Sequence, residues 1–229
     1  MDILGLISST THIIAQATND SGALNWLAAK YEAGGIFMHP IFACLILGLA
    51  FSFERFWNLT RARVNTKDFL VKVTTALKEG GIEEARDLCA STRGPVASVF
   101  HAGLLRADEG LDAAEKAIMS YGGIEMGFLE KGMIWISTFI TIAPMLGFTG
   151  TVQGMITAFD AIKEAAQISP AIVADGISVA LLTTLFGLVV AMILQVFYNY
   201  FISKIDGLVS DMEESSVQLI DALYELKSK

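Results

Sequence analysis

Three long stretches without a charged side chain constrain the fold of this chain more than any other feature. They cover residues 33–53, 132–159 and 176–203 of the 229-residue sequence. Each is longer than the roughly 18 to 20 residues that a helix needs to cross the hydrocarbon core of a bilayer. Only helices and closed barrels satisfy their backbone in lipid, and these stretches do not alternate with period two. We therefore predict an all-α membrane protein with three transmembrane helices.

The composition supports a membrane location and argues against several other classes of protein. Charged residues make up 17% and hydrophobic residues 53% of the chain, whereas about 25% of a soluble domain is charged. The net charge of −8 argues against nucleic acid as a partner. Because the sequence has no P-loop, no GxGxxG after a strand and no recognisable nucleophile and base pair, we do not expect an enzyme.

The cysteines and histidines do not predict a metal or a cofactor. Cys44 lies in the first uncharged stretch and Cys89 in a polar region, so we expect both thiols to be reduced and packed. His12, His39 and His101 are scattered along the chain, and a zinc site needs about four clustered ligands. We therefore expect no metal site and no cofactor.

The distribution of lysine and arginine predicts the orientation in the membrane. Fourteen of the 16 cationic residues lie in residues 55–131 or 204–229, and only Lys30 and Lys163 lie elsewhere. By the positive-inside rule, the N-terminus and the loop after the second span face outward. The long middle segment and the C-terminus then face the cytoplasm.

These observations divide the chain into seven segments. Residues 1–32 are assigned to an interfacial amphipathic segment on the outer side, 33–57 to the first span, 58–131 to a cytoplasmic helical domain, 132–159 to the second span, 160–172 to an outer loop, 173–203 to the third span and 204–229 to a cytoplasmic C-terminal helix. The first segment places Leu24, Leu27, Ala28 and Tyr31 on one helical face, as a helix lying at a membrane interface would.

The third span is expected to continue as a helix far into the cytoplasm. Ser169 and Pro170 provide an N-cap and a first helical residue on the outer side. Apolar or small residues then recur at spacings of four and three after the span, which is the pattern of a heptad seam. The seam consists of Ile205, Val209, Met212, Ser216, Leu219, Leu223 and Leu226.

The second span has a similar helical lead-in on the cytoplasmic side. Leu111, Ala114, Ile118 and Tyr121 lie on one face of a helix over residues 111–131. Three glycines near the end of this segment lower its helix propensity. Two of the three spans are therefore expected to extend into a cytoplasmic helical bundle.

Small side chains form one narrow face on each of the second and third spans. The second span carries Ala143, Gly147, Gly150, Thr151, Gly154 and Ala158, and the third carries Gly176, Ala180, Thr184, Gly187 and Ala191. Such faces let helix backbones approach closely. They fit either packing of these two helices within the chain, or a polar lining or an interface with other subunits. Thr151 and Thr184 place hydroxyls at mid-membrane depth, although threonine often bonds only a carbonyl of its own helix.

No span carries a carboxylate, histidine or lysine near its centre. Glu54 and Arg55 lie at the inner end of the first span, His39 lies near its outer end, and Asp175 lies at the outer end of the third. An ion or proton path usually displays an intramembrane carboxylate, histidine or lysine. If charge moves through this protein, another chain must bring the group that titrates.

The sequences of the spans resemble those of the MotA/TolQ/ExbB proton-channel family. The resemblance rests on "APMLGFTGTVQGMITAF" at residues 143–159, "DGISVALLTTLFGLVVAMILQVFYNYF" at residues 175–201 and the Glu-Arg of "FERFW" at residues 53–57. It covers the three spans in order and extends over most of the chain. Three spans rather than four resemble the ExbB and TolQ branches more than the flagellar stator branch.

This resemblance implies a homopentamer in the inner membrane of a Gram-negative bacterium, with the N-terminus in the periplasm. The pentamer would enclose the single transmembrane helices of two ExbD- or TolR-like subunits, each with the aspartate that titrates. Thr151 and Thr184 fall on the family threonines that line the proton route. One position departs from the family, because Val179 stands where many relatives have glutamate. Asp175 lies one turn outward and is either a substitute at the outer entrance or a solvated acid at the helix start.

Two classes of function remain open. The first is a motor subunit, surrounded by membrane lipid, that couples the proton gradient to work on a TonB-like partner and so energises transport across the outer membrane. A TolQ-like role in envelope maintenance is the variant of this hypothesis. The second is a non-conducting scaffold in which Gly147, Gly150, Gly154 and Gly187 only pack helices or subunits together.

Overall fold

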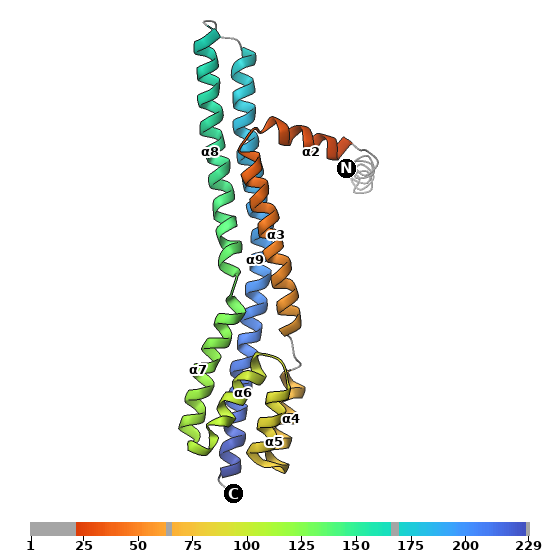
Figure 1. Ribbon diagram of the computed structural model, residues 1–229, viewed down its shortest axis with the longest axis vertical. Coiled ribbons are helices and arrows are strands. Elements are labelled where there is room, and N and C mark those ends of the chain that lie inside the picture. Colours follow the sequence, from red (N-terminus) through yellow and green to blue (C-terminus); the bar gives the residue numbers. More distant parts are fainter. Residues whose placement is uncertain (1–21, 63–65, 166–169, 228–229) are drawn as a thin grey trace, which may run out of the picture. The chain divides into compact units, whose positions relative to one another are not determined.

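The computed structural model describes residues 22–62, 66–165 and 170–227, and these residues form helices joined by short turns (Figure 1). The helices are α2 (Gly22–Ala33), α3 (Met38–Ala62), α4 (Thr66–Glu79), α5 (Gly81–Ser91), α6 (Pro95–Leu105), the 3-10 helix η1 (Ala107–Glu109), α7 (Leu111–Glu130), α8 (Met133–Ala165) and α9 (Pro170–Lys227). The described part of the chain contains no strand.

Three of these helices are long and apolar enough to cross a membrane. The candidate spans are Met38–Thr60 in α3, Met133–Glu164 in α8 and Val173–Leu226 in α9. The prediction of an all-α membrane protein with three membrane-spanning helices is therefore confirmed. The first 21 residues of the predicted interfacial segment and the expected N-cap Ser169 lie outside the described residues.

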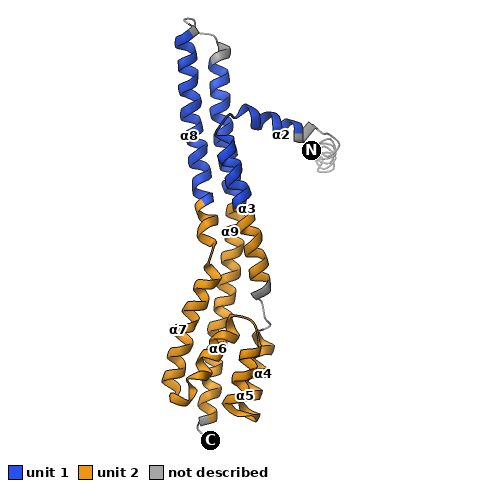
Figure 2. Ribbon diagram, viewed as in Figure 1, with its two compact units in different colours: residues 1–47, 139–193 blue, residues 48–138, 194–229 orange. Residues whose placement is uncertain are grey.

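The chain forms two compact units (Figure 2). Unit 1 consists of residues 1–47 and 139–193, and unit 2 consists of residues 48–138 and 194–229. Helices α3, α8 and α9 each contribute residues to both units, while α4 to α7 belong to unit 2 alone.

Unit 1 contains α2, the N-terminal parts of α3 and α9, and α8 from residue 139 onward. A turn at Gly34–Gly35, where Gly35 has a φ of +72°, connects α2 to α3. The Tyr31 ring contacts His39 and Phe42 edge-on, with ring centroids 5.4 and 5.7 Å apart. Both contacts lie where α2 leads into α3, and they stabilise this turn.

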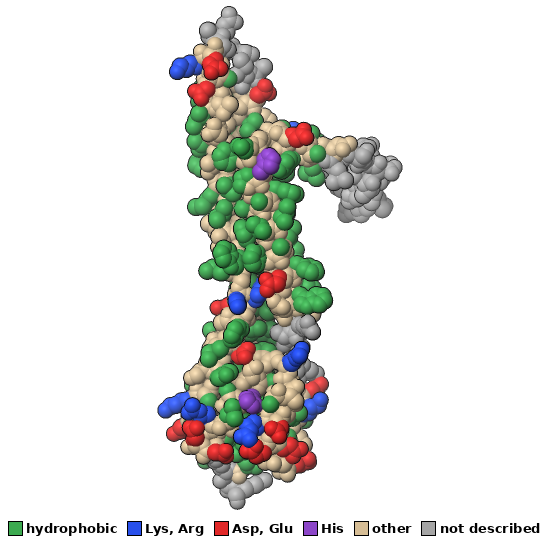
Figure 3. All heavy atoms as spheres, in the orientation of Figure 1, with side chains coloured by type: hydrophobic (Ala, Val, Ile, Leu, Met, Phe, Trp, Pro, Cys, Tyr) green, Lys and Arg blue, Asp and Glu red, His purple; other side chains and the backbone are tan. Residues whose placement is uncertain are grey.

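The outward faces of α8 and α9 in unit 1 carry large apolar side chains that the chain itself does not cover (Figure 3). More than 60% of the surface of Met145, Phe148, Leu181 and Met192 is exposed. Soluble proteins rarely expose contiguous apolar surface of this kind. The same surface is favourable against lipid chains, which agrees with the assignment of these helices as membrane spans.

Unit 2 is a helical bundle with its own hydrophobic core. The core is formed by α4 to α7 and the C-terminal part of α9, and the rings of Phe69 and Phe100 stack within it at 5.8 Å. The predicted seam on α9 is buried here, since Met212, Leu219 and Leu223 are all at most 3% exposed. The heptad pattern therefore located the core-facing side of α9 correctly.

The two long helices differ in continuity. Helix α9 runs unbroken through 58 residues, as the heptad seam that follows the third span predicted. The lead-in to the second span is a separate helix, because α7 ends at Glu130 and α8 begins at Met133. The chain turns at Gly132, whose φ of +89° is a conformation that glycine adopts without steric cost. The three earlier glycines of α7 do not interrupt the helix.

Candidate functional site

The small-residue faces of α8 and α9 meet inside unit 1 and bring the two backbones into direct contact. A methyl group added at Gly187 would lie 2.6 Å from the Ala143 carbonyl oxygen, and one at Gly147 would lie 2.8 Å from the Thr183 carbonyl oxygen. A methyl group at Gly154 would lie 3.0 Å from the Gly176 carbonyl oxygen. We call this region the α8–α9 contact. A side chain at Gly147, Gly154 or Gly187 would collide with the backbone of the facing helix, so glycine is required at these three positions.

The α8–α9 contact therefore uses the glycines within one chain. Gly147, Gly150, Gly154 and Gly187 are all buried, and the residues nearest to each of them belong to the facing helix. Of the two interpretations of these faces, packing within the chain accounts for all four glycines. They do not by themselves indicate an interface with other subunits.

Three threonines lie at or beside this contact, and their hydroxyls have different partners. The Thr184 hydroxyl donates across the contact to the Gly147 carbonyl oxygen at 3.3 Å, and the residue is half-buried. The Thr151 hydroxyl donates to the Phe148 carbonyl oxygen of its own helix at 2.6 Å. Thr151 is also half-buried. Each hydroxyl oxygen keeps the capacity to accept a hydrogen bond from a protonated acid or a water.

Thr183 is the residue that the sequence analysis missed. It is fully buried, its hydroxyl donates to the Ala180 carbonyl oxygen at 2.9 Å, and it packs directly against Gly150. The adjacent pair Thr183-Thr184 was visible in the sequence, but spacing alone selected Thr184 for the helix contact. In the structure Thr183 fills the centre of the contact, while Thr184 lies at its edge.

Asp175 and Val179 line one cavity in unit 1. The cavity has a volume of about 490 Å³ and lies between the α2–α3 turn, α8 and α9. Gln153 and Thr157 of α8 line it as well. Asp175 is exposed, so its carboxylate has access to solvent at the position that the resemblance marks as an outer entrance. Val179, where the resemblance leads us to expect glutamate, thus shares a cavity with Asp175.

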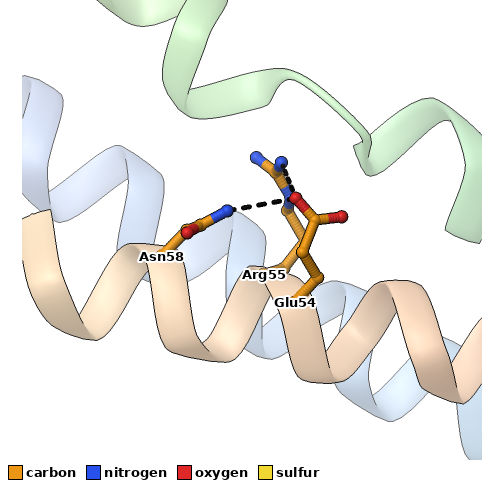
Figure 4. Close-up of polar contacts among 3 residues, drawn as sticks. All are labelled: Glu54, Arg55 and Asn58. Atoms are coloured by element: carbon orange, nitrogen blue, oxygen red, sulfur yellow. Dashed lines mark hydrogen bonds and ion pairs between the residues drawn. The ribbon is translucent and has the colours of Figure 1, made fainter.

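Glu54 and Arg55 form a polar cluster at the end of α3 within unit 2 (Figure 4). Arg55 and Asn58 both donate to Oε1 of Glu54, at 3.0 and 3.1 Å. The Arg55 side chain is only 9% exposed, and its guanidinium lies against Gly132 at the α7–α8 turn. Arg55 therefore connects α3 to the point where the chain enters the second span.

The cysteines and metal-ligating side chains do not form a further site in the described residues. Cys44 and Cys89 are both free and buried, which confirms that they are packed thiols. Burial raises the pKa of the Cys89 thiol to about 12. Among the residues that the structure describes, no group of three His, Cys, Asp or Glu side chains is arranged to hold a metal ion.

Comparison with known proteins shows which family this chain belongs to. The model of the MotA/TolQ/ExbB proton channel family matches residues 91–214. This chain belongs to that family. The matched region covers more than half of the sequence and contains Thr151, Asp175, Thr184 and the four glycines of the α8–α9 contact. The Glu54–Arg55 pair precedes it.

Individual relatives of this chain carry the names of two branches of the family. An ExbB homolog of Methanothermobacter thermautotrophicus is 32% identical over 184 residues, which is 80% of this chain and 65% of the relative. The biopolymer transport protein ExbB of Pseudomonas putida is 36% identical over 92 residues, 40% of this chain and 28% of the relative. The Tol-Pal system protein TolQ of Haemophilus influenzae is 32% identical over 87 residues, 38% of each chain. The aligned regions cover less than two thirds of the length of each of these relatives.

Proposed function

We propose that this chain is an ExbB-like subunit of a proton-driven motor. In this proposal it assembles with single-span ExbD-like partners and couples the proton gradient across the inner membrane to TonB-dependent transport across the outer membrane. The observation that carries the proposal is the α8–α9 contact, where hydroxyls lie on closely packed helices of a family of proton channels. The same two spans contain no Asp, Glu, His, Lys or Arg within residues 132–159 and 176–203.

The roles of this chain and of its partner follow from the lack of an acidic side chain within the two spans. A chain without an intramembrane acid cannot carry a proton by its own titration, so the proposal assigns the titrating aspartate to the partner helix. Thr151 and Thr184 would accept a hydrogen bond from that acid or hold a water beside it, because both hydroxyl oxygens have free lone pairs. Asp175 would collect protons at the outer mouth.

The proposal also includes an orientation in the membrane and an oligomeric state. The lysine and arginine distribution supports an N-terminus in the periplasm, a C-terminus in the cytoplasm and a cytoplasmic location for residues 58–131. A homopentamer is supported by the family resemblance and by the broad apolar surface that α8 and α9 leave exposed. The glycines of the α8–α9 contact do not contribute to that argument.

Specific observations favour two other candidates. The similarity to a TolQ protein favours a Tol-type role in envelope maintenance with a TolR-like partner. The four glycines pack α8 against α9 within one chain. This packing favours a non-conducting scaffold, because it explains the small-residue faces without a pore lining.

The experiment that tests the proposal is proton flux in proteoliposomes. The chain would be reconstituted alone, with the single-span protein encoded beside it, and with that partner carrying an Asp→Asn substitution in its span. The proposal expects a proton flux only with the unmodified partner. Flux no higher than that of empty liposomes in all three preparations would support the scaffold instead, and equal flux above that level in all three would refute the assignment of the titrating acid to the partner. A TolQ-like role is separated by testing whether loss of the gene impairs TonB-dependent uptake or envelope integrity.

A further inference from the structure

A small cavity lies between the ends of α3 and α9 in unit 2, at the border of the third uncharged stretch. Its volume is about 220 Å³. It is lined by Phe56, Leu59 and Thr60 from α3 and by Tyr200, Phe201, Lys204 and Leu208 from α9. We call it the α3–α9 cavity. Lys204 is the first charged residue after residues 176–203, so the cavity lies at the level where the apolar span ends.

The lining of the α3–α9 cavity combines one cation with aromatic walls. Lys204 is the only charged residue among the described lining residues, and its ammonium lies 5.6 Å from the centroid of the Tyr200 ring. Within the described chain no carboxylate lies within 4 Å of this ammonium. The half-buried lysine therefore has no anionic partner among the described residues.

The walls of the cavity are held in place by contacts between the two helices. The rings of Phe56 and Tyr200 stack with centroids 6.4 Å apart. Further along the span, Gly48 of α3 packs directly against the Leu194 side chain of α9. These two contacts fix the spacing of α3 and α9 on the membrane side of the cavity.

Exposed apolar side chains continue from the cavity toward the centre of the span. Phe53 on α3 and Val196 on α9 are each 70% exposed, and Phe197 is 40% exposed. The surface thus offers a cationic end and an apolar stretch on the same pair of helices. A free inorganic anion would use only the cationic end, whereas a phospholipid would use both.

We propose that the α3–α9 cavity binds the headgroup of an anionic phospholipid from the leaflet at the inner end of α3. The Lys204 ammonium pairs with the lipid phosphate, Tyr200 and Phe56 enclose the glycerol region, and an acyl chain lies along Phe53 and Val196. Aromatic and cationic side chains at this depth are favourable because the rings are amphipathic and the anionic surface attracts the charge. This inference does not depend on proton conduction.

The test is lipid retention by the assembled protein. The protein would be reconstituted in nanodiscs of phosphatidylcholine with a minor share of phosphatidylglycerol, then extracted in mild detergent, and the retained lipids quantified by mass spectrometry. We expect enrichment of phosphatidylglycerol over its share in the nanodisc. Lys204→Gln should lower this enrichment about fivefold, the scale of one cation against an anionic lipid, and Lys204→Arg should preserve it.

Lys131→Gln is the matched control, since Lys131 is exposed next to the start of α8 and does not line the cavity. It removes the same charge near the same end of the spans and should leave the enrichment unchanged. Equal loss in both variants would show general surface attraction and overturn the proposal. Displacement of phosphatidylglycerol by inorganic phosphate at constant ionic strength would indicate a free-anion site and would overturn it as well. Unchanged enrichment in Lys204→Gln would do the same.

Discussion

Replacing Gly187 by alanine should separate α8 from α9. The added methyl group would lie 2.6 Å from the Ala143 carbonyl oxygen and 3.3 Å from the Gly147 Cα, while ordinary contact begins at 3.4 Å. The facing atoms belong to backbone, so the helices would have to move apart by about 0.8 Å. Movement of this kind would also lengthen the hydrogen bond from the Thr184 hydroxyl to the Gly147 carbonyl, which is already 3.3 Å long.

The expected change in stability combines two destabilising contributions, overpacking and a lost hydrogen bond, with one stabilising contribution, the higher helix propensity of alanine. Overpacking a close contact costs about 1 to 3 kcal/mol, and a lost hydrogen bond between membrane helices adds about 0.6 kcal/mol. Alanine in place of glycine stabilises a helix by about 1 kcal/mol. The net effect of Gly187→Ala should be a destabilisation of about 0.6 to 2.6 kcal/mol.

The assay is unfolding by titration of the detergent-solubilised protein with sodium dodecyl sulfate, followed by circular dichroism. Gly207→Ala in the same helix is the matched control, because nothing lies within 4 Å of a methyl group there. That variant should be as stable as the parent protein or slightly more stable. If Gly187→Ala were as stable as Gly207→Ala, the close backbone contact between α8 and α9 would be refuted.

Three further predictions concern other parts of the chain. Leu219→Asp with Leu223→Asp should unfold the unit 2 bundle, since both side chains are 0% exposed and an unpaired buried carboxylate is costly; an unchanged melting temperature would contradict this. Burial raises the Cys89 pKa to about 12 from 9.0, so the folded state retains the thiol proton more strongly and stability should fall as pH rises above about 9. In a Cys44→Ser background, a Cys89→Ala variant should lose that decline. Asp175→Asn should reduce proton flux modestly if Asp175 collects protons at the mouth, and an unchanged flux would leave it a solvated acid.

The three spans and the continuation of α9 beyond the third span could be predicted from the sequence, because both follow from local patterns. The length of an uncharged stretch predicts a span, and the spacing of apolar residues predicts a buried helix face. Each uncharged stretch overlaps one of the candidate membrane-spanning helices α3, α8 and α9, and the seam identified Leu219 and Leu223 as core positions. The turn at Gly132 was not predicted. Several glycines in this region have equal helix propensity, so propensity does not single out Gly132. The buried Arg55 guanidinium that packs against Gly132 comes from α3, which is distant in the sequence.

The details of the candidate site could be predicted only in part. The sequence placed the small residues on two faces, and the structure brings those faces together within one chain. The sequence could not show whether Thr183 or Thr184 occupies the centre of the α8–α9 contact. Neighbouring residues on a helix are about 100° apart, so the residue that faces α8 depends on the rotation of α9 about its axis. That rotation is set by the close approach of Gly147, Gly154 and Gly187 to the opposite backbone.

Proton flux through a Thr151→Val, Thr184→Val protein reconstituted with its single-span partner tests the central proposal most directly. Valine preserves the shape of threonine and removes the hydroxyl, so the complex should still assemble. The flux should fall toward that of the complex whose partner carries Asp→Asn, and the two substitutions need not be additive because they act on one proton. Thr→Ser at both positions should retain most of the flux. If the valine variant assembled and conducted protons like the parent complex, the hydroxyls beside the α8–α9 contact would be packing groups only.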